Sequence, residues 1–228
     1  MGLRTILGLK KQKPNPYMNE SYSQEGEDGI LARVFGDRST GFFVDVGAHH
    51  PMRFSNTYKF YKRGWRGINV DAWPGSMDAF NDLRPLDINL EIPVSDRQEE
   101  LPFYVFNEPA LNTFSKALAE EYQKKDAYKI DKTVIMKTST LAKILDEHLP
   151  KNQGVDFMSI DAEGFDYRIL TSNNWLKYSP KVVLIESDLS VPDLIKSDLN
   201  KYMEENQYEF FSKTVRTIFF KQRSFIIT

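Results

Sequence analysis

The stretch that decides the fold of this sequence is FFVDVGAHHP, residues 42–51. Its first five residues predict a short buried strand, and Gly47 predicts a tight turn directly after it. Loops that bind phosphates usually carry several glycines, because their backbone N–H groups must approach an anion closely. This loop has the carboxylate of Asp45 at its head, and His49, His50 and Pro51 stand where later glycines would be. A carboxylate repels a pyrophosphate and attracts a cation. The loop therefore favours S-adenosylmethionine (SAM), which carries a sulfonium and an ammonium and no phosphate, over NAD or ATP.

Composition narrows the class of protein. The chain has 228 residues, of which 41% are hydrophobic and 27% charged, as expected of a globular domain rather than a disordered segment. Its net charge of −2 gives no broad basic surface, which argues against nucleic acid as a partner. It has no cysteine and three histidines, which excludes disulfides, thiolate zinc sites and a cysteine nucleophile and disfavours an all-histidine metal site.

Residues 1–19 are expected to form an N-terminal arm, and residues 20–228 a single domain. Pro14 and Pro16 interrupt regular structure between the two. Apolar and basic side chains in the arm could make a weak peripheral membrane contact, but a frayed or docked arm is the favoured interpretation. No apolar run is long enough for a transmembrane segment, and a cytoplasmic location is expected.

Predicted strands alternate with predicted helices along most of the chain. This order is typical of an α/β fold with a mostly parallel sheet and helices on both faces. Strands are predicted over residues 42–46, 67–70, 88–94, 156–160 and 181–185, helices over 24–35, 56–62, 76–83, from 167 onward and over 191–206, and a terminal antiparallel pair over 210–220 and 223–227.

An insertion at about residues 100–140 interrupts the alternation. Two further strands, over 102–106 and 133–137, flank a polar helix over 116–129. An insertion between the third and fourth strands would lie near the carboxyl edge of the sheet, where substrates enter α/β folds. Its polar and aromatic side chains fit recognition of a sugar, and basic residues elsewhere could meet a phosphate: Tyr104, Asn107, Asn112, Thr113, Phe114 and Ser115 for the sugar, and Arg53, Lys59 and Arg84 for the phosphate.

Three carboxylates, of Asp45, Asp71 and Asp161, fall at the ends of predicted parallel strands. A carboxylate after the second strand is well placed to accept both hydroxyl groups of a ribose. Acids after strands are also common turn residues, so one alone would be weak evidence. Together with the loop at residues 45–51, they indicate an adenosine cofactor.

The sequence resembles the FkbM-type SAM-dependent methyltransferases, a class I group. The resemblance rests on SQEGED (23–28), GFFVDVGAHHP (41–51), SNT (55–57), GWRGINVD (64–71), VSD (94–96) and DFMSIDAEG (156–164). It implies a Rossmann-like class I methyltransferase fold, with a mostly parallel seven-stranded sheet and a terminal antiparallel pair. One departure is Asp71-Ala72-Trp73-Pro74, where the family more often has a glutamate-proline segment.

The resemblance also implies which residues hold SAM. Asp45, Gly47 and Ala48 would line its methionine and ribose, and Asp71 would hold the ribose diol. The remaining cofactor-binding candidates are Ala72, Trp73, Ser95 and Asp96 beside the adenine, Gln24 closing the site, and Asp161.

Methylation of a sugar hydroxyl needs a base or a metal, because the hydroxyl has a high pKa. His49 and His50 are candidate bases, since imidazole titrates near neutral pH. Glu163 is the third catalytic candidate, because it shares a strand face with Asp161. Asp161, Glu186 and Asp188 are candidate ligands for Mg²⁺ or Mn²⁺, although clustered acids can equally be caps and solvated turns.

The sequence thus predicts a SAM-dependent O-methyltransferase that acts on a saccharide or nucleotide-linked sugar in glycan biosynthesis. One alternative is a methyltransferase for another small natural-product acceptor, and another is a SAM-binding partner module without turnover. The missing phosphate glycines disfavour an NAD-dependent oxidoreductase. The charge balance disfavours a nucleic-acid methyltransferase.

Overall fold

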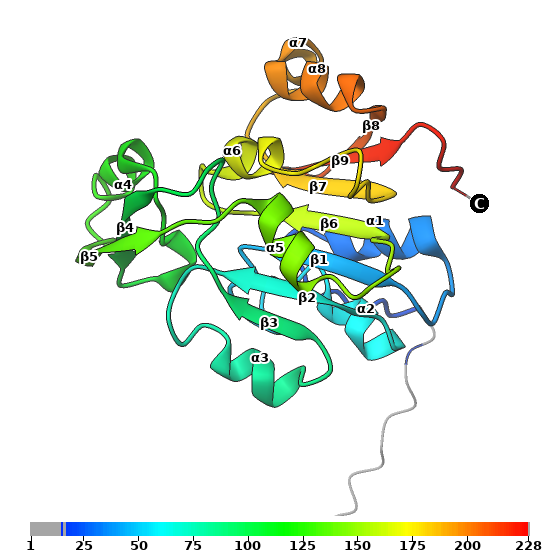
Figure 1. The fold of residues 1–228 in the computed structure, drawn as a ribbon, viewed down its shortest axis with the longest axis horizontal. Coiled ribbons are helices and arrows are strands. Elements are labelled where there is room, and N and C mark those ends of the chain that lie inside the picture. Colours follow the sequence, from blue (N-terminus) through cyan, green and yellow to red (C-terminus); the bar gives the residue numbers. More distant parts are fainter. Residues whose placement is uncertain (1–14, 16, 228) are drawn as a thin grey trace, which may run out of the picture.

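A computed structural model describes residue 15 and residues 17–227. Its centre is a seven-stranded sheet with the order β3-β2-β1-β6-β7-β9-β8 (Figure 1). The first five of these strands are mutually parallel, and β9 and β8 complete the sheet as antiparallel neighbours. The strands are β1 (Phe42–Val46), β2 (Arg66–Asp71), β3 (Ile88–Glu91), β6 (Phe157–Ile160), β7 (Val182–Glu186), β8 (Tyr208–Lys213) and β9 (Thr217–Gln222). The predicted Rossmann-like α/β fold is confirmed.

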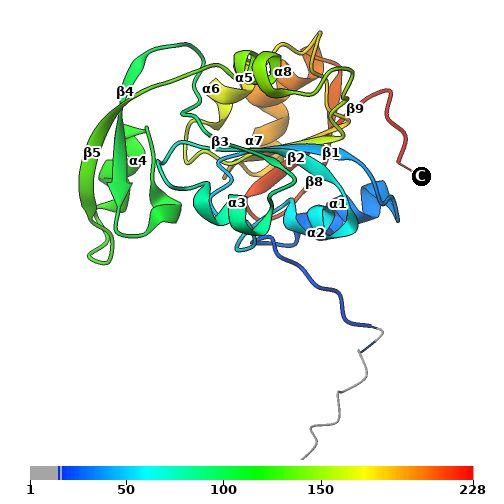
Figure 2. The same cartoon turned by 60° about the horizontal axis from the view of Figure 1, so that its bottom comes forward.

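Helices cover both faces of the sheet (Figure 2). One face packs against α1 (Glu27–Phe35) and α2 (Tyr58–Arg63) through a cluster that includes Leu31, Phe60 and Trp65. The other face packs against α5 (Leu141–His148), α6 (Asp166–Thr171), α7 (Val191–Lys196) and α8 (Asp198–Glu205) through a larger cluster. A further helix, α3 (Asp78–Leu83), contributes Phe80 to a small cluster with Ala48 and Met77.

The side chains of β1 alternate between these two layers, as the period of a strand requires. Phe42, Val44 and Val46 belong to the larger cluster, and Phe43 belongs to the α1–α2 cluster. Every residue of this strand is buried. Asp45 shares the face of Phe43, so its carboxylate is carried into the protein beside α2 rather than out to solvent.

The direction in which the chain adds strands reverses between β1 and β6. The chain runs from β1 outward to β2 and β3, and later strands add on the other side of β1. Ligands of open α/β sheets bind outside the carboxyl ends of the strands at such a reversal.

The insertion forms a small substructure beside the carboxyl ends of the parallel strands (Figure 1). It consists of the antiparallel strands β4 (Glu100–Phe106) and β5 (Ile130–Lys137), the 3-10 turn η1 (Pro109–Leu111) and the helix α4 (Lys116–Tyr122). The helix is shorter than the predicted span of 116–129, because the chain turns after the C-cap residue Gln123.

Several predicted boundaries differ from the structure. The third strand ends at Glu91 rather than at residue 94, and the predicted helix over 191–206 is two helices that meet at Ser197, whose hydroxyl caps α8. The terminal pair is Tyr208–Lys213 with Thr217–Gln222, so residues 223–227 are not a strand. The structure also contains a helix that is absent from the predicted elements, α5, which Thr140 caps and whose buried apolar face is Leu141, Ile144 and Leu145.

The expected N-terminal arm lies almost entirely outside the described residues, and so does its possible membrane contact. Within residues 17–227 no helix is both long and apolar enough to cross a membrane.

Candidate active site

A cavity of about 400 Å³ lies at the carboxyl ends of β1, β2 and β6. It is lined by residues that follow these three strands and by residues of the insertion. Its position coincides with the reversal of strand order between β1 and β6. Its volume falls within the range of small-molecule sites.

The glycine of the loop after β1 is required by a neighbouring loop. Gly47 has a φ of 79°, in the left-handed region, and a Cβ there would lie 1.6 Å from the backbone oxygen of Asp161. The backbone N–H groups of Gly47 and Ala48 both donate to the oxygen of Val70, at 2.9 and 3.1 Å. The loops after β1, β2 and β6 therefore meet at this residue, and all three line the cavity.

Asp45 reaches the cavity wall from a buried polar network. Its carboxylate accepts a hydrogen bond of 2.9 Å from the Thr57 hydroxyl, and Arg84 donates to the same hydroxyl at 3.0 Å. Arg84 is fully buried and pairs with Asp87 at 2.9 Å. Burial raises the pKa of Asp45, and the charge of Arg84 partly offsets this effect. The prediction that Arg84 could meet a phosphate is wrong, because its side chain lies inside the protein.

Asp71 ends β2 and holds two loops by their backbones. One carboxylate oxygen accepts from the N–H of His49 and the other from the N–H of Trp73, both at 3.0 Å. Burial raises the pKa of Asp71, and these hydrogen bonds lower it. Asp71, Ala72 and Trp73 all line the cavity, and their contacts with a ribose and an adenine stay a prediction.

One end of the cavity is apolar, which the sequence did not predict. It is lined by side chains of the larger core cluster that come from distant segments: Ile92, Val94, Phe103, Phe114 and Ile169. Trp73 stacks on Phe103 at 6.3 Å, and Lys132 lies 4.6 Å from the Trp73 ring. An apolar wall of this kind suits a flat aromatic ligand group such as adenine.

Ser95 and Asp96, predicted beside the adenine, are not among the residues that line the cavity. Ser95 is fully buried and donates to Asp96 at 3.0 Å. Asp96 accepts from the guanidinium of Arg168 at 2.8 Å. Gln24 does line the cavity, from the segment before α1.

The two histidines of the loop differ in what their ring nitrogens do. His50 Nδ1 accepts from the backbone N–H groups of Met52 and Arg53, both at 3.0 Å, so its proton is on Nε2. His49 Nε2 is buried and has no hydrogen-bond partner among the described residues. Burial lowers the pKa of both rings, which keeps both neutral at pH 7. His49 is therefore the better placed of the two to receive a proton.

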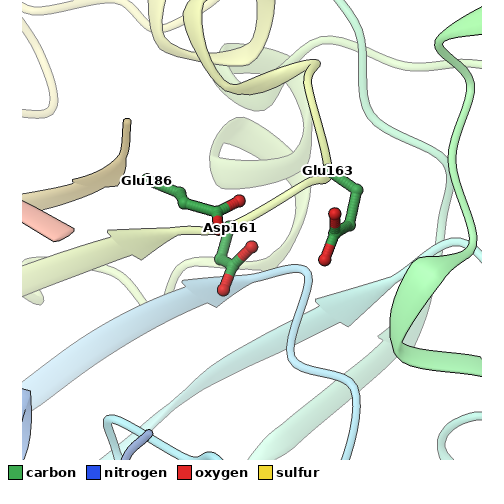
Figure 3. Close-up of side chains that lie close together, drawn as sticks. All are labelled: Asp161, Glu163 and Glu186. Atoms are coloured by element: carbon green, nitrogen blue, oxygen red, sulfur yellow. The ribbon is translucent and has the colours of Figure 1, made fainter. Parts of the chain in front are cut away.

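Three carboxylates meet beside the end of β6. Oxygen atoms of Asp161, Glu163 and Glu186 all lie within 4.8 Å of one another (Figure 3). Asp161 is exposed and lines the cavity. Its pKa is nevertheless raised well above the ordinary value, first by desolvation and then by the charges of Glu186, Asp166 and Glu163. Burial raises the pKa of Glu163 from 4.5 to about 7. Glu163 is therefore partly protonated near neutral pH, and Asp161 keeps its proton to a higher pH than an ordinary aspartate.

Two distant groups contact this acid cluster. The hydroxyl of Tyr122, on α4, donates to Glu163 at 2.5 Å. The guanidinium of Arg216 lies 2.8 Å from Glu186 and 3.3 Å from Asp188. The Asp188 side chain is 83% exposed and is not part of the cluster, whereas Glu163, which the sequence did not place among the metal ligands, is.

The polar side chains of the insertion are used within the protein. Asn112 accepts from the N–H of Phe106, Ser115 caps α4, and Asn107 bonds to the backbone of Ala127 and Lys129. Thr113 donates to the backbone oxygen of Glu163 at 2.7 Å. Asn107 and Ser115 are not among the residues that line the cavity. Asn112, Thr113 and Phe114 do line it, so a contact between the insertion and a sugar stays a prediction.

Carboxylate oxygens are the ligands that Mg²⁺ and Mn²⁺ prefer. Asp161, Glu163 and Glu186 could in principle supply three of them. The guanidinium of Arg216 beside Glu186 opposes this use, because it already supplies a positive charge to these acids. The donor set is thus partly neutralised by a residue of the protein itself.

Comparisons with known proteins identify the family of the chain and its fold. A family model described as the methyltransferase FkbM domain matches residues 45–210. Among solved structures, the fold is similar to the crystal structure of methyltransferase FkbM from Methylobacillus flagellatus KT, with a TM-score of 0.52 and 11% sequence identity. That match covers 88% of this chain and 48% of the other, so this chain spans about half its length. At this identity the likeness concerns the fold alone. No curated protein shows a significant match to the chain.

Proposed function

Because this chain belongs to the FkbM methyltransferase family, we propose that it transfers the methyl group of SAM to a hydroxyl group of a saccharide. The observation that carries the cofactor assignment is the cavity itself. Its carboxylates at the ends of β1 and β2 suit a cation and a ribose diol, and its apolar end suits adenine. Three chemically different parts of one ligand thus find matching surroundings in one cavity.

When bound, SAM would supply a methyl group already activated by its sulfonium. Asp71 would hold the ribose hydroxyls, while Ala72, Trp73 and Phe103 would contact the adenine. Asp45 and Asp161 would provide negative charge toward the methionine end. The protein has then to align the acceptor and remove one proton.

Glu163 is the proposed general base. Its pKa of about 7 lies near neutrality, where a base is most effective. The Glu163 carboxylate would take the proton of the acceptor hydroxyl as the acceptor oxygen bonds to the methyl carbon, the methyl–sulfur bond breaks and S-adenosylhomocysteine leaves. His49, with its free Nε2, is the second candidate for this proton.

A neutral acceptor group fits the acid cluster better than an anionic one. Asp161, Glu163 and Glu186 would repel a phosphate or carboxylate near the transferred methyl group. A saccharide hydroxyl is therefore the proposed acceptor, and the phosphates of a nucleotide-linked sugar would have to lie away from this cluster.

A role for Mg²⁺ or Mn²⁺ is the alternative use of the same acids. We expect methyl transfer to be unchanged by exhaustive EDTA treatment, and a loss restored by Mg²⁺ would establish the metal instead.

Thermal unfolding with and without SAM tests the cofactor assignment, with NADH as the control ligand. At a hundredfold excess over its dissociation constant, a ligand of the native state adds about 2.7 kcal/mol of stability. We expect Asp71→Asn to weaken the shift caused by SAM, and Asp82→Asn, an exposed acid on α3, to leave it unchanged. The absence of any SAM-dependent shift in folded wild-type protein would refute the proposal. Release of S-adenosylhomocysteine with a panel of saccharides would then identify the acceptor.

A further inference from the structure

The contact between Tyr122 and Glu163 joins two segments that are 41 residues apart. We propose that Tyr122 is a positioning residue for Glu163, whose carboxylate it holds at the cavity and ties to the insertion. This inference rests on the proposed function, in which Glu163 receives the acceptor proton. Tyr122 itself is not among the residues that line the cavity, so it would act through Glu163.

The hydroxyl of Tyr122 is held in place by its ring. The ring is half-buried at the end of α4 and packs edge-on against Phe106 of β4, with the ring centroids 5.8 Å apart. The ring of Tyr128 also packs edge-on against the Tyr122 ring, with the ring centroids 6.5 Å apart. A hydroxyl fixed in this way restricts the Glu163 side chain to one position at little cost in entropy, because the ring is already ordered.

The insertion also fixes the backbone of Glu163. This residue has a φ of 46°, in the left-handed region that non-glycine residues rarely adopt. Thr113 donates to its backbone oxygen at 2.7 Å, and Ser115 and Leu118 lie against the next residue, Gly164. A conformation of this kind persists only where surrounding contacts impose it, and such residues cluster at functional sites. The insertion therefore holds both the main chain and the carboxylate of the same residue.

Tyr122 is the donor in this contact whenever Glu163 is ionised. Burial and the hydrogen bond to Glu163 raise the pKa of Tyr122, so its phenol keeps its proton and can donate. The hydrogen bond lowers the pKa of Glu163 against the larger effect of burial. The other charged groups that face Glu163 are Asp161, Asp166, Glu186 and Arg216, of which only Arg216 also favours the ionised carboxylate. Removal of the Tyr122 hydroxyl should therefore leave Glu163 protonated to a higher pH.

The test is a carboxyl ¹³C NMR titration of protein labelled at glutamate, without SAM or acceptor. Glu163→Gln identifies the Glu163 signal by its absence. Tyr122→Phe removes the hydroxyl and keeps the ring, and we expect it to move the Glu163 midpoint upward by about one pH unit. Tyr128→Phe is the matched control, because among the described residues the Tyr128 hydroxyl makes no hydrogen bond, and it should leave the midpoint unchanged. If Tyr122→Phe does not fold, Tyr122→Leu repeats the test.

An unchanged Glu163 midpoint in folded Tyr122→Phe would overturn the proposal. The titration needs no turnover, so its failure leaves the methyltransferase assignment standing, and failure of SAM to bind leaves the titration valid. Where an acceptor is known, the acidic limb of the pH profile of kcat/KM should move upward with Tyr122→Phe and stay in place with Tyr128→Phe. A uniform loss of activity at all pH values would indicate a merely structural role and would also contradict the proposal.

Discussion

The two sides of the cavity both place carboxylates at the ends of parallel strands, and they use them differently. On the β1–β2 side, Asp45 and Asp71 accept hydrogen bonds from a hydroxyl and from backbone N–H groups of neighbouring loops. On the β6–β7 side, Asp161, Glu163 and Glu186 face one another, and their partners come from distant parts of the chain. The first side is a scaffold, in which each acid holds a loop. The second side holds protons. Position after a strand is thus not enough to assign a role, and the partners of each acid decide it.

The largest effect is expected from Gly47→Ala on the scaffold side. The new Cβ would lie 1.6 Å from a backbone oxygen of the loop after β6, so the two loops would have to separate. We expect a loss of about 5 kcal/mol or more in the free energy of unfolding, or no folded protein. Urea unfolding followed by circular dichroism measures it.

Gly29→Ala, in α1, is the control for that substitution. A Cβ at Gly29 meets nothing within 4 Å, and alanine favours a helix, so stability should stay the same or rise by about 0.5–1 kcal/mol. A Gly47→Ala protein as stable as the wild type would show that the two sides of the cavity are not joined at this glycine.

The next effect is expected from Arg84→Met, which removes the buried cation of the scaffold side. Asp87 and Asp45 would be left buried without it, at a cost of about 3–5 kcal/mol at pH 7.5. Burial raises the pKa of both acids, so they become neutral as the pH falls, and the loss should be smaller at pH 5. Urea unfolding at both pH values tests this, with exposed Arg33→Met as the control. An equal loss at both pH values would exclude the two carboxylates as its cause.

On the β6–β7 side, Glu163→Gln should raise the free energy of unfolding, whereas Arg84→Met lowers it. A carboxyl whose pKa rises from 4.5 in the unfolded chain to about 7 in the folded one binds its proton more tightly when folded. Its ionisation therefore weakens the fold as the pH rises through this window. Replacement by glutamine should be near neutral at pH 4.5 and stabilising by up to about 3 kcal/mol at pH 8, while methyl transfer falls by about 10²–10⁴-fold. Glu121→Gln, exposed on α4, is the control. A destabilised Glu163→Gln protein at pH 8 would assign Glu163 to the scaffold.

Local sequence predicted most of the scaffold side. The run Phe42–Val46 has the apolar density of a buried strand, and its bounds agree with the structure. Asp71 ends the second strand and lines the cavity, and so does Trp73, whose place beside the adenine only the family resemblance implied. These features depend on a strand, its turn and the next strand, which are neighbours along the chain. Their positions could therefore be inferred from pattern and spacing.

The acid side depends on contacts that no local pattern encodes. Whether Glu186 or Asp188 reaches Asp161 is decided by where β7 ends relative to β6 and by Arg216, which pairs with both acids. The partner of Glu163 is a tyrosine within a helix that the sequence presented only as a charged surface. Arg84 likewise resembled any exposed basic residue, since its burial requires the packing of Phe43, Tyr61 and Phe80 around it.

The smallest effect is expected from substitution of His50. It tests whether this histidine only stabilises a turn, as the acids of the β1–β2 side hold loops, or takes part in proton transfer with Glu163. Nδ1 of His50 accepts from two backbone N–H groups, so the ring stabilises a turn and offers no free lone pair to an acceptor. An asparagine oxygen can take over that acceptance. His50→Asn should therefore change the free energy of unfolding by less than about 0.5 kcal/mol, whereas His50→Ala should cost about 1 kcal/mol. Methyl transfer by His50→Asn should stay within about threefold of the wild type, because an imidazole that carries its proton on Nε2 and accepts at Nδ1 has no nitrogen left to act as a base. A loss of a hundredfold or more in a folded His50→Asn protein would instead place this histidine with Glu163 among the groups that move the proton.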